Sequence, residues 1–170
     1  MILIGIGSNL AVVPFVSPLH TAAAALTRLP ALGIAIVRHS RWYLSEPVPP
    51  SDQPWYVNAV AIVETRLPPL ALLDSLLALE ARFRRRRGAP NAARTLDLDL
   101  LDYDGRRMAT PRLVLPHPRL DRRRFVLAPL AEVAPGWRHP RLGEDAAGLL
   151  ARLPPGQRVR PLGERQRKSG

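Results

Sequence analysis

The hydrophobic positions of this chain change their spacing several times along its first hundred residues. Runs with the apolar or alternating pattern of β-strands are separated by segments in which apolar residues recur at helical spacing. The predicted strands cover residues 2–6, 33–44 and 55–65 and the run that contains Asp97 and Asp99. The predicted helices cover residues 17–29, 70–87 and, with a weaker pattern, 145–152. Ser17 is expected to cap the first helix and Gly88 to end the second.

The order of these elements predicts the fold class. Strand, helix, strand, strand, helix, strand is the order of the split βαβ unit in a ferredoxin-like fold. An α+β protein with an antiparallel sheet and helices on one face would follow. The proline-rich segment 45–54 is expected to be an ordered loop. Residues 1–153 are expected to form a single domain, followed by a basic, disordered tail over residues 154–170.

Composition narrows the class of protein. The 170 residues include no cysteine, which excludes disulfides and thiolate metal sites. The sequence has no apolar run long enough to span a membrane and no secretory leader, so a cytoplasmic protein is expected. The net charge of +11 is concentrated in residues 82–94, 119–124 and 154–170. Positive charge concentrated in this way suits a polyanion, either a nucleotide triphosphate or a nucleic-acid backbone.

Asp97 and Asp99 are the most informative residues. They alternate with leucines, so both carboxylates should point to the same face of the strand. Adjacent carboxylates repel unless a cation lies between them, and Mg²⁺ takes carboxylate ligands together with phosphate oxygens. The alternative is an edge strand with a solvated polar face. Asp102 and Asp104 are expected to be turn residues before Gly105.

Arginines and a histidine surround this strand in the sequence. Arg94 lies three residues before Asp97, and Arg84 to Arg87 lie one loop upstream. A metal ion beside cations is what phosphoryl-type transfer requires, whereas a solvated helix end or an RNA-binding patch would explain the arginines equally well. His117, between two prolines, could donate to a phosphate, carry a proton or be structural.

Aromatic residues are few in this chain, which draws attention to Tyr56 and Phe125. Core packing explains both. The alternative is a flat ring stacked between them, with Asn58 on the Tyr56 face of its strand offering a donor and an acceptor to an amide-like edge.

Four segments together resemble one family, the 6-hydroxymethyl-7,8-dihydropterin pyrophosphokinases of folate biosynthesis. They are "IGIGSNL", "SRWYLSEPVPPSDQPWYVNAV", "RTLDLDLL" and "LPHPRLDRRRFVLAPLAEVAP". They occur in the order and spacing of that family, and the R-T-x-D-x-D element followed by P-H-P-R is highly specific.

The resemblance implies an activity and a set of site residues. The activity would be transfer of diphosphate from ATP to the hydroxymethyl oxygen of the pterin, with release of AMP. Two Mg²⁺ ions would be held by Asp97 and Asp99. The residues implied for the pterin are Ser45, Val48, Tyr56, Asn58 and Phe125. Those implied for ATP are Glu80, Arg87, Arg94, His117 and Arg123. The implied catalytic residues are Arg85, Arg94, Asp97 and Asp99.

The chain departs from the family pattern in one loop. The segment "GAPNAARTLDLD" lacks the tryptophan usual there and is slightly shorter, so the choice of Arg85 and Arg87 among Arg84 to Arg87 is ambiguous. The partners expected are small-molecule substrates, with no nucleic acid and no membrane, and the protein is expected to be a monomer. The alternatives are a ferredoxin-like RNA-binding module that uses the arginine clusters and an inactive relative that retains only the pterin pocket.

Overall fold

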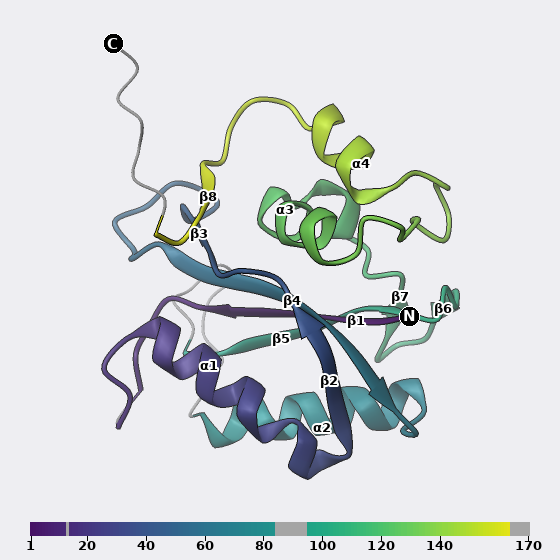
Figure 1. The fold of residues 1–170 in the computed structure, drawn as a ribbon, viewed down its shortest axis with the longest axis horizontal. Coiled ribbons are helices and arrows are strands. Elements are labelled where there is room, and N and C mark those ends of the chain that lie inside the picture. Colours follow the sequence, from purple (N-terminus) through teal and green to yellow (C-terminus); the bar gives the residue numbers. More distant parts are fainter. Residues whose placement is uncertain (13, 84–94, 164–170) are drawn as a thin grey trace.

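The computed structural model describes residues 1–12, 14–83 and 95–163, and its elements are arranged around one central sheet (Figure 1). The strands are β1 (Ile2–Ser8), β2 (Ile34–His39), β3 (Tyr43–Ser45), β4 (Tyr56–Thr65), β5 (Asp97–Tyr103), β6 (Met108–Ala109), β7 (Val114–Leu115) and β8 (Val159–Pro161). The helices are α1 (Pro18–Arg28), α2 (Pro69–Arg82), α3 (Arg124–Val133) and α4 (Ala146–Arg152), with short 3₁₀ turns at Pro30–Leu32 and Leu120–Arg122. None of the helices in these described ranges is long and apolar enough to cross a membrane.

The central sheet is antiparallel, with the strand order β5-β1-β4-β3-β8. Strand β2 also pairs with β4, farther along it than β3 does. The run predicted as one strand over residues 33–44 is therefore two strands, both paired to β4. The order β1, α1, β2, β4, α2, β5 confirms the α+β, ferredoxin-like prediction.

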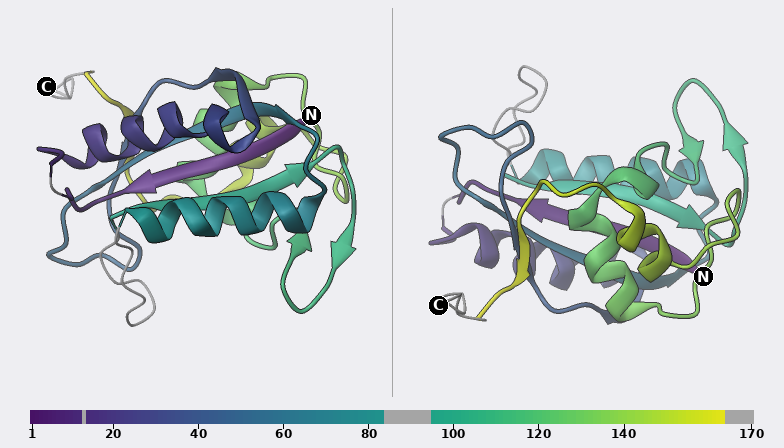
Figure 2. Two further views of the ribbon diagram at one scale, coloured as in Figure 1. Left: turned by 90° about the horizontal axis from the view of Figure 1, so that it is seen from below. Right: turned by 90° about the horizontal axis from the view of Figure 1, so that it is seen from above.

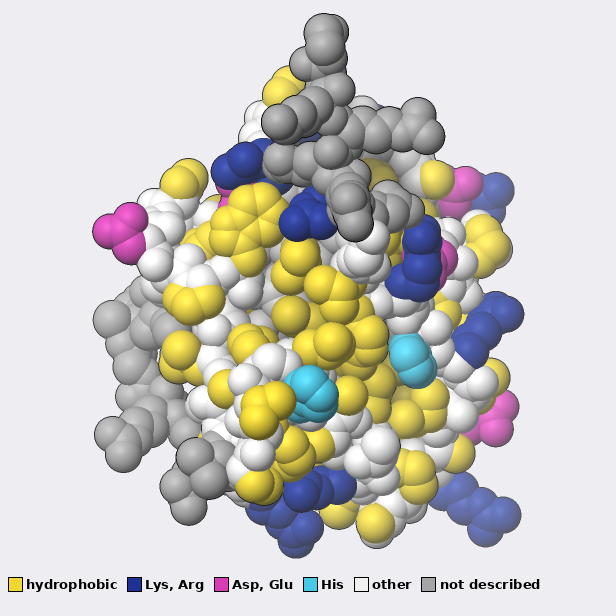
Figure 3. All heavy atoms as spheres, turned by 60° about the vertical axis from the view of Figure 1, so that its left-hand side comes forward, with side chains coloured by type: hydrophobic (Ala, Val, Ile, Leu, Met, Phe, Trp, Pro, Cys, Tyr) yellow, Lys and Arg dark blue, Asp and Glu magenta, His cyan; other side chains and the backbone are white. Residues whose placement is uncertain are grey.

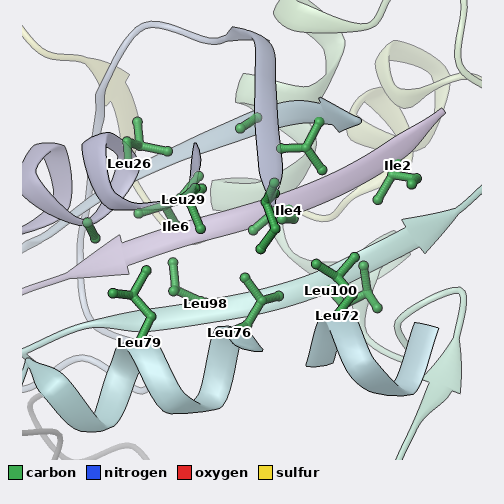
Figure 4. Close-up of a cluster of buried hydrophobic side chains, with 14 of the residues drawn as sticks. Ile2, Ile4, Ile6, Leu26, Leu29, Leu72, Leu76, Leu79, Leu98 and Leu100 are labelled. Carbon is green, nitrogen blue, oxygen red and sulfur yellow. The ribbon is translucent and has the colours of Figure 1, made fainter. Parts of the chain in front are cut away.

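Helices α1 and α2 cover one face of the sheet and enclose the larger hydrophobic core. Leucines on one side of each helix meet the isoleucines of β1 and the leucines of β5 (Figure 4). The labelled members of this cluster are Ile2, Ile4, Ile6, Leu26, Leu29, Leu72, Leu76, Leu79, Leu98 and Leu100. Helical spacing on α2 and period-two spacing on the strands place these side chains on facing surfaces, and their burial drives the association.

The second face of the sheet is also covered, which corrects the expectation of helices on one face only. Helices α3 and α4 lie there, on the side opposite α1 and α2 (Figure 2). Their apolar side chains pack against Leu3, Val60, Ile62 and Leu101. Leu101 lies on this side by the same alternation as Asp97 and Asp99, and a shift in register between Leu3 and Ile4 lets Asp102 face it as well.

Two segments differ from the sequence-based expectations. Helix α3 was not predicted, and Pro129 lies inside it. The prediction of a disordered tail is wrong for residues 154–163, because β8 pairs there with β3 in an antiparallel ladder.

The molecule also exposes hydrophobic side chains near the centre of one side, with basic side chains mainly at the rim (Figure 3).

Asp102 is more than a turn residue. Its side chain is buried, with 2% exposed, and accepts hydrogen bonds from the Trp137 indole at 2.7 Å and from the Gly105 amide at 3.1 Å. Asp104, in the same turn, is exposed and pairs with the α-amino group of Met1 at 2.6 Å. Asp102 therefore ties the end of β5 to the segment that follows α3.

We expect Asp102→Ala to lower the unfolding free energy by about 2 kcal/mol, because the buried indole N–H loses a charged acceptor. The matched change Asp104→Asn removes an exposed ion pair and keeps a residue type that tolerates the φ of 52° at this position, so it should lower the unfolding free energy by less than about 1 kcal/mol. Urea unfolding measures both values. Equal effects would contradict a structural role for Asp102.

Candidate active site

A cleft of about 460 Å³ lies on the α3 face of the sheet, beside the N-terminal end of that helix. Its floor is formed by β1, β4 and β5, and its walls by the loop after β3, by the arginine-rich start of α3 and by residues 153–157. A volume of this size suits a small-molecule ligand.

The strand register builds the floor of the cleft. Asp97 on β5 lies opposite Gly7 on β1, and Gly7 lies opposite Asn58 on β4. A Cβ atom added at Gly7 would lie 3.2 Å from Asn58 Oδ1 and 3.9 Å from Asp97 Cβ. Glycine therefore leaves open the space between an amide and a carboxylate that share one face of the sheet. Sequence reasoning missed this role of Gly7.

One half of the cleft combines aromatic rings with an oriented amide. Asn58 Nδ2 donates to Ser45 Oγ at 2.6 Å, and both residues are at least 95% buried. Because the amide nitrogen is held by Ser45, the Asn58 carbonyl oxygen lies toward Gly7. Tyr56 and Phe125 also line this half, as does Val48. The structure thus brings together all five residues listed above for the pterin.

The other half is lined by Asp97 and guanidinium groups, and Asp99 lies beside it in contact with Arg123. Asp97 and Asp99 point to the same face of β5, as predicted, because they pair with Gly7 and Gly5. Arg123 Nη1 donates to Asp99 Oδ2 at 3.1 Å, and its guanidinium lies 5.5 Å from the centre of the Phe125 ring. Arg123 therefore links the charged half of the cleft to the aromatic half.

The two carboxylates fit a magnesium ion that binds together with phosphate. Their oxygens are ligands of the kind that Mg²⁺ prefers, and Asp97 lines the cleft. No group of three or more histidine, cysteine, aspartate or glutamate residues suited to a metal ion is found within the described ranges. An ion held by Asp97 and Asp99 would take its other ligands from phosphate and water.

His117 is held as a neutral ring near Asp99. Burial lowers the pKa of His117, and the opposing effect of the Asp99 charge is smaller. Nδ1 accepts a hydrogen bond from the backbone amide of Arg119 at 3.1 Å. A backbone amide only donates, so the proton lies on Nε2 and makes that atom a donor.

Arginines line the wall on the α3 side. Arg119, Arg122 and Arg124 join Arg123 there, and they come from the basic run "RLDRRR". The charge pattern indicated this cluster but only Arg123 was singled out. Arg124 also donates to the carbonyl oxygens of Leu153, at 3.4 Å, and Pro154, at 3.1 Å.

Among the described residues, neither His117 nor Glu80 is part of the cleft lining. Glu80 is buried on the other side of β5, where its Oε1 accepts from the Leu98 amide at 2.7 Å and so positions the strand. Arg85, Arg87 and Arg94 lie outside the described residues. Their contacts with ATP and their catalytic roles stay predictions, as does the contact of Glu80.

A comparison with known families defines the class of protein. The model of the 7,8-dihydro-6-hydroxymethylpterin-pyrophosphokinase family matches residues 3–135. This match covers most of the chain, and so the chain belongs to that family. The resemblance seen in the sequence is confirmed.

Individual relatives are named as pterin pyrophosphokinases or as folate synthesis proteins. The chain is 42% identical to a 2-amino-4-hydroxy-6-hydroxymethyldihydropteridine pyrophosphokinase of Pseudomonas aeruginosa over 89% of this chain and 90% of the relative. It is 40% identical to the Synechocystis protein of that name over 88% of this chain and 74% of the relative. A mitochondrial folate synthesis bifunctional protein of Arabidopsis thaliana is 36% identical over 78% of this chain. The matched part is 23% of that longer protein. These comparisons give no support to the RNA-binding alternative.

The neutral state of His117 predicts a pH dependence of stability. The unfolded chain takes up a proton near pH 6.5 that the folded ring resists, so the unfolding free energy should decrease as the pH falls below 6.5. His117→Asn keeps an acceptor for the Arg119 amide but cannot be protonated. We expect this variant to lose less stability than the wild type between neutral and acidic pH in urea unfolding. An equal loss in both proteins would contradict the assignment.

Proposed function

We propose that this protein transfers diphosphate from ATP to the hydroxymethyl oxygen of 6-hydroxymethyl-7,8-dihydropterin and releases AMP. One observation of the structure supports this activity most directly. A single cleft joins an aromatic half that contains an oriented amide to a half lined by Asp97 and arginines, one of which holds Asp99 beside the cleft. The first half suits a flat, amide-bearing ring, and the second suits a phosphate chain.

The pterin ring stacks between Tyr56 and Phe125 in this proposal. The Asn58 carbonyl oxygen accepts from an N–H on the edge of the ring, and the hydrogen bond to Ser45 keeps the amide in that orientation. Because Asn58 is 96% buried in the sheet, its direction does not change when the ligand arrives. Backbone groups near Val48 complete the contacts.

The triphosphate of ATP lies along the charged half. Asp97 and Asp99 hold magnesium, for which we propose two ions, and Arg123 and His117 contact phosphate oxygens. Magnesium held by Asp97 and Asp99 would reduce the negative charge that an attacking oxygen must approach. Arg123 neutralises Asp99 before the nucleotide binds and then turns to phosphate.

The side chains of the cleft orient the two substrates for a single displacement at the β-phosphorus of ATP. The hydroxymethyl oxygen attacks the β-phosphorus of ATP, and the bond between that phosphorus and the oxygen bridging to the α-phosphorus breaks. AMP leaves with the bridging oxygen, and the proton of the hydroxyl group passes to solvent. Gly7 leaves the space between Asn58 and Asp97 in which the two substrates meet.

The product of turnover tests this function. Incubation with ATP, Mg²⁺ and the hydroxymethyl pterin should give AMP and the pterin diphosphate in equal amounts. ADP in place of AMP would indicate ordinary phosphorylation, and an absence of turnover with folded protein would contradict the proposal.

We expect Asp97→Asn to reduce turnover by about a hundredfold or more, because a neutral amide is a poor magnesium ligand. The matched control is Asp74→Asn on the exposed surface of α2, where the carboxylate pairs with Arg112. It should leave turnover unchanged. Steady-state assays on both variants, with circular dichroism to check folding, measure the difference. Activity of Asp97→Asn close to that of the control would remove Asp97 from the reaction.

Phe125→Ala should weaken pterin binding by about 1–3 kcal/mol through lost burial and stacking. Phe125→Leu keeps most of the burial and should lose only about 1 kcal/mol. Calorimetry with the pterin in the presence of Mg²⁺ and a nonhydrolysable ATP analogue measures both. An unchanged pterin affinity in the alanine variant would show that the ring binds elsewhere.

A further inference from the structure

The segment after α4 returns across the molecule to the edge of the sheet. It passes α3 and ends in β8 beside β3 (Figure 1). In this ladder Val159 pairs with Ser45, which is the residue that holds the Asn58 amide. Residues 153–157 line the cleft on the way. Sequence reasoning had placed most of this segment in a disordered tail.

Glu46 forms hydrogen bonds with one end of the segment through both its backbone and its side chain. The Glu46 carboxylate accepts from the backbone amide of Arg158 at 2.7 Å and from its Nε at 3.0 Å. The Glu46 amide donates to the Arg158 carbonyl oxygen at 3.1 Å, and the Glu46 carbonyl accepts from Gln157 Nε2 at 2.7 Å. The Glu46 side chain is only 18% exposed, and the Arg158 guanidinium lies 5.0 Å from the centre of the Trp55 ring.

Arg124 forms hydrogen bonds with the other end of the segment. Its guanidinium donates to the carbonyl oxygens of Leu153 and Pro154, and Arg124 directly precedes Phe125 in α3. The segment is thus attached at one end to the loop that contains Val48 and at the other to the helix that carries Phe125. Both attachments lie next to residues that line the aromatic half of the cleft.

We propose that residues 153–158 form a wall of the pterin pocket and that Glu46 is the positioning residue that holds this wall against the loop after β3. This inference rests on the proposed function. Glu46 is among the residues that line the cleft, but its carboxylate is bonded to Arg158, so in this proposal it acts by holding the wall in place. It keeps Ser45 and Val48 at a set separation from Phe125, so that the ring meets a pocket whose sides are already in place. Binding is then stronger because less of the chain has to be ordered when the ligand enters.

The test is Glu46→Gln, which removes the charge of the carboxylate but keeps its size. We expect the dissociation constant of the pterin, measured with Mg²⁺ and a nonhydrolysable ATP analogue, to rise about tenfold. The KM for the pterin should rise with it, whereas the KM for ATP should change less than about twofold, because the charged half of the cleft is untouched. Gln157→Ala removes only the hydrogen bond to the Glu46 carbonyl and should have a smaller effect in the same direction.

Glu132→Gln is the matched control. Glu132 accepts from the Arg41 amide at 2.7 Å and from Arg41 Nε at 3.0 Å, which repeats the Arg158 pattern at a site that does not line the cleft. Melting temperatures show whether the two variants lose similar amounts of stability. If they do, and Glu46→Gln binds the pterin as tightly as Glu132→Gln, the inference is overturned. If Glu46→Gln does not fold, as judged by circular dichroism, unchanged pterin affinity in Gln157→Ala overturns it. Failure of the wild type to form AMP would instead contradict the proposed function itself.

Discussion

The repulsion between two carboxylates on one face of a strand is relieved by positive charge, and this interaction organises the cleft. Asp97 and Asp99 point the same way because the strand period is two. Arg123 supplies positive charge directly through its contact with Asp99, and it also lies over the Phe125 ring. The start of α3 is therefore tied to the edge of the sheet by charge as well as by packing.

The sheet sets the spacing between the two halves of the cleft. Neighbouring strands lie about 5 Å apart, so the row from Asp97 through Gly7 to Asn58 separates the carboxylate from the amide by two strand spacings. Such a separation does not depend on the conformation of a loop. Glu80 supports this row from the opposite face by accepting from the amide of Leu98 in the same strand.

The sequence allowed much of this arrangement to be predicted, because strand and helix periods repeat over many residues. The order of strands and helices along the chain and the shared face of Asp97 and Asp99 followed from such local patterns. Helix α3 was missed because Pro129 argues against a helix, although here it is accommodated within one. Strand β8 was missed because its segment is short, basic and rich in proline, and only pairing with β3 makes it regular. The role of Gly7 depends on its neighbours across two strands, which no local pattern reveals.

The contact between Glu46 and Arg158 joins residues that are 112 positions apart. During synthesis, β1, β4 and β5 can pair as soon as residue 103 has left the ribosome, whereas the cleft gains its last wall only after residue 158 has been added. A growing chain therefore contains the strands of the cleft floor well before it contains the last wall of the pocket. Its ability to recognise a small molecule is acquired late.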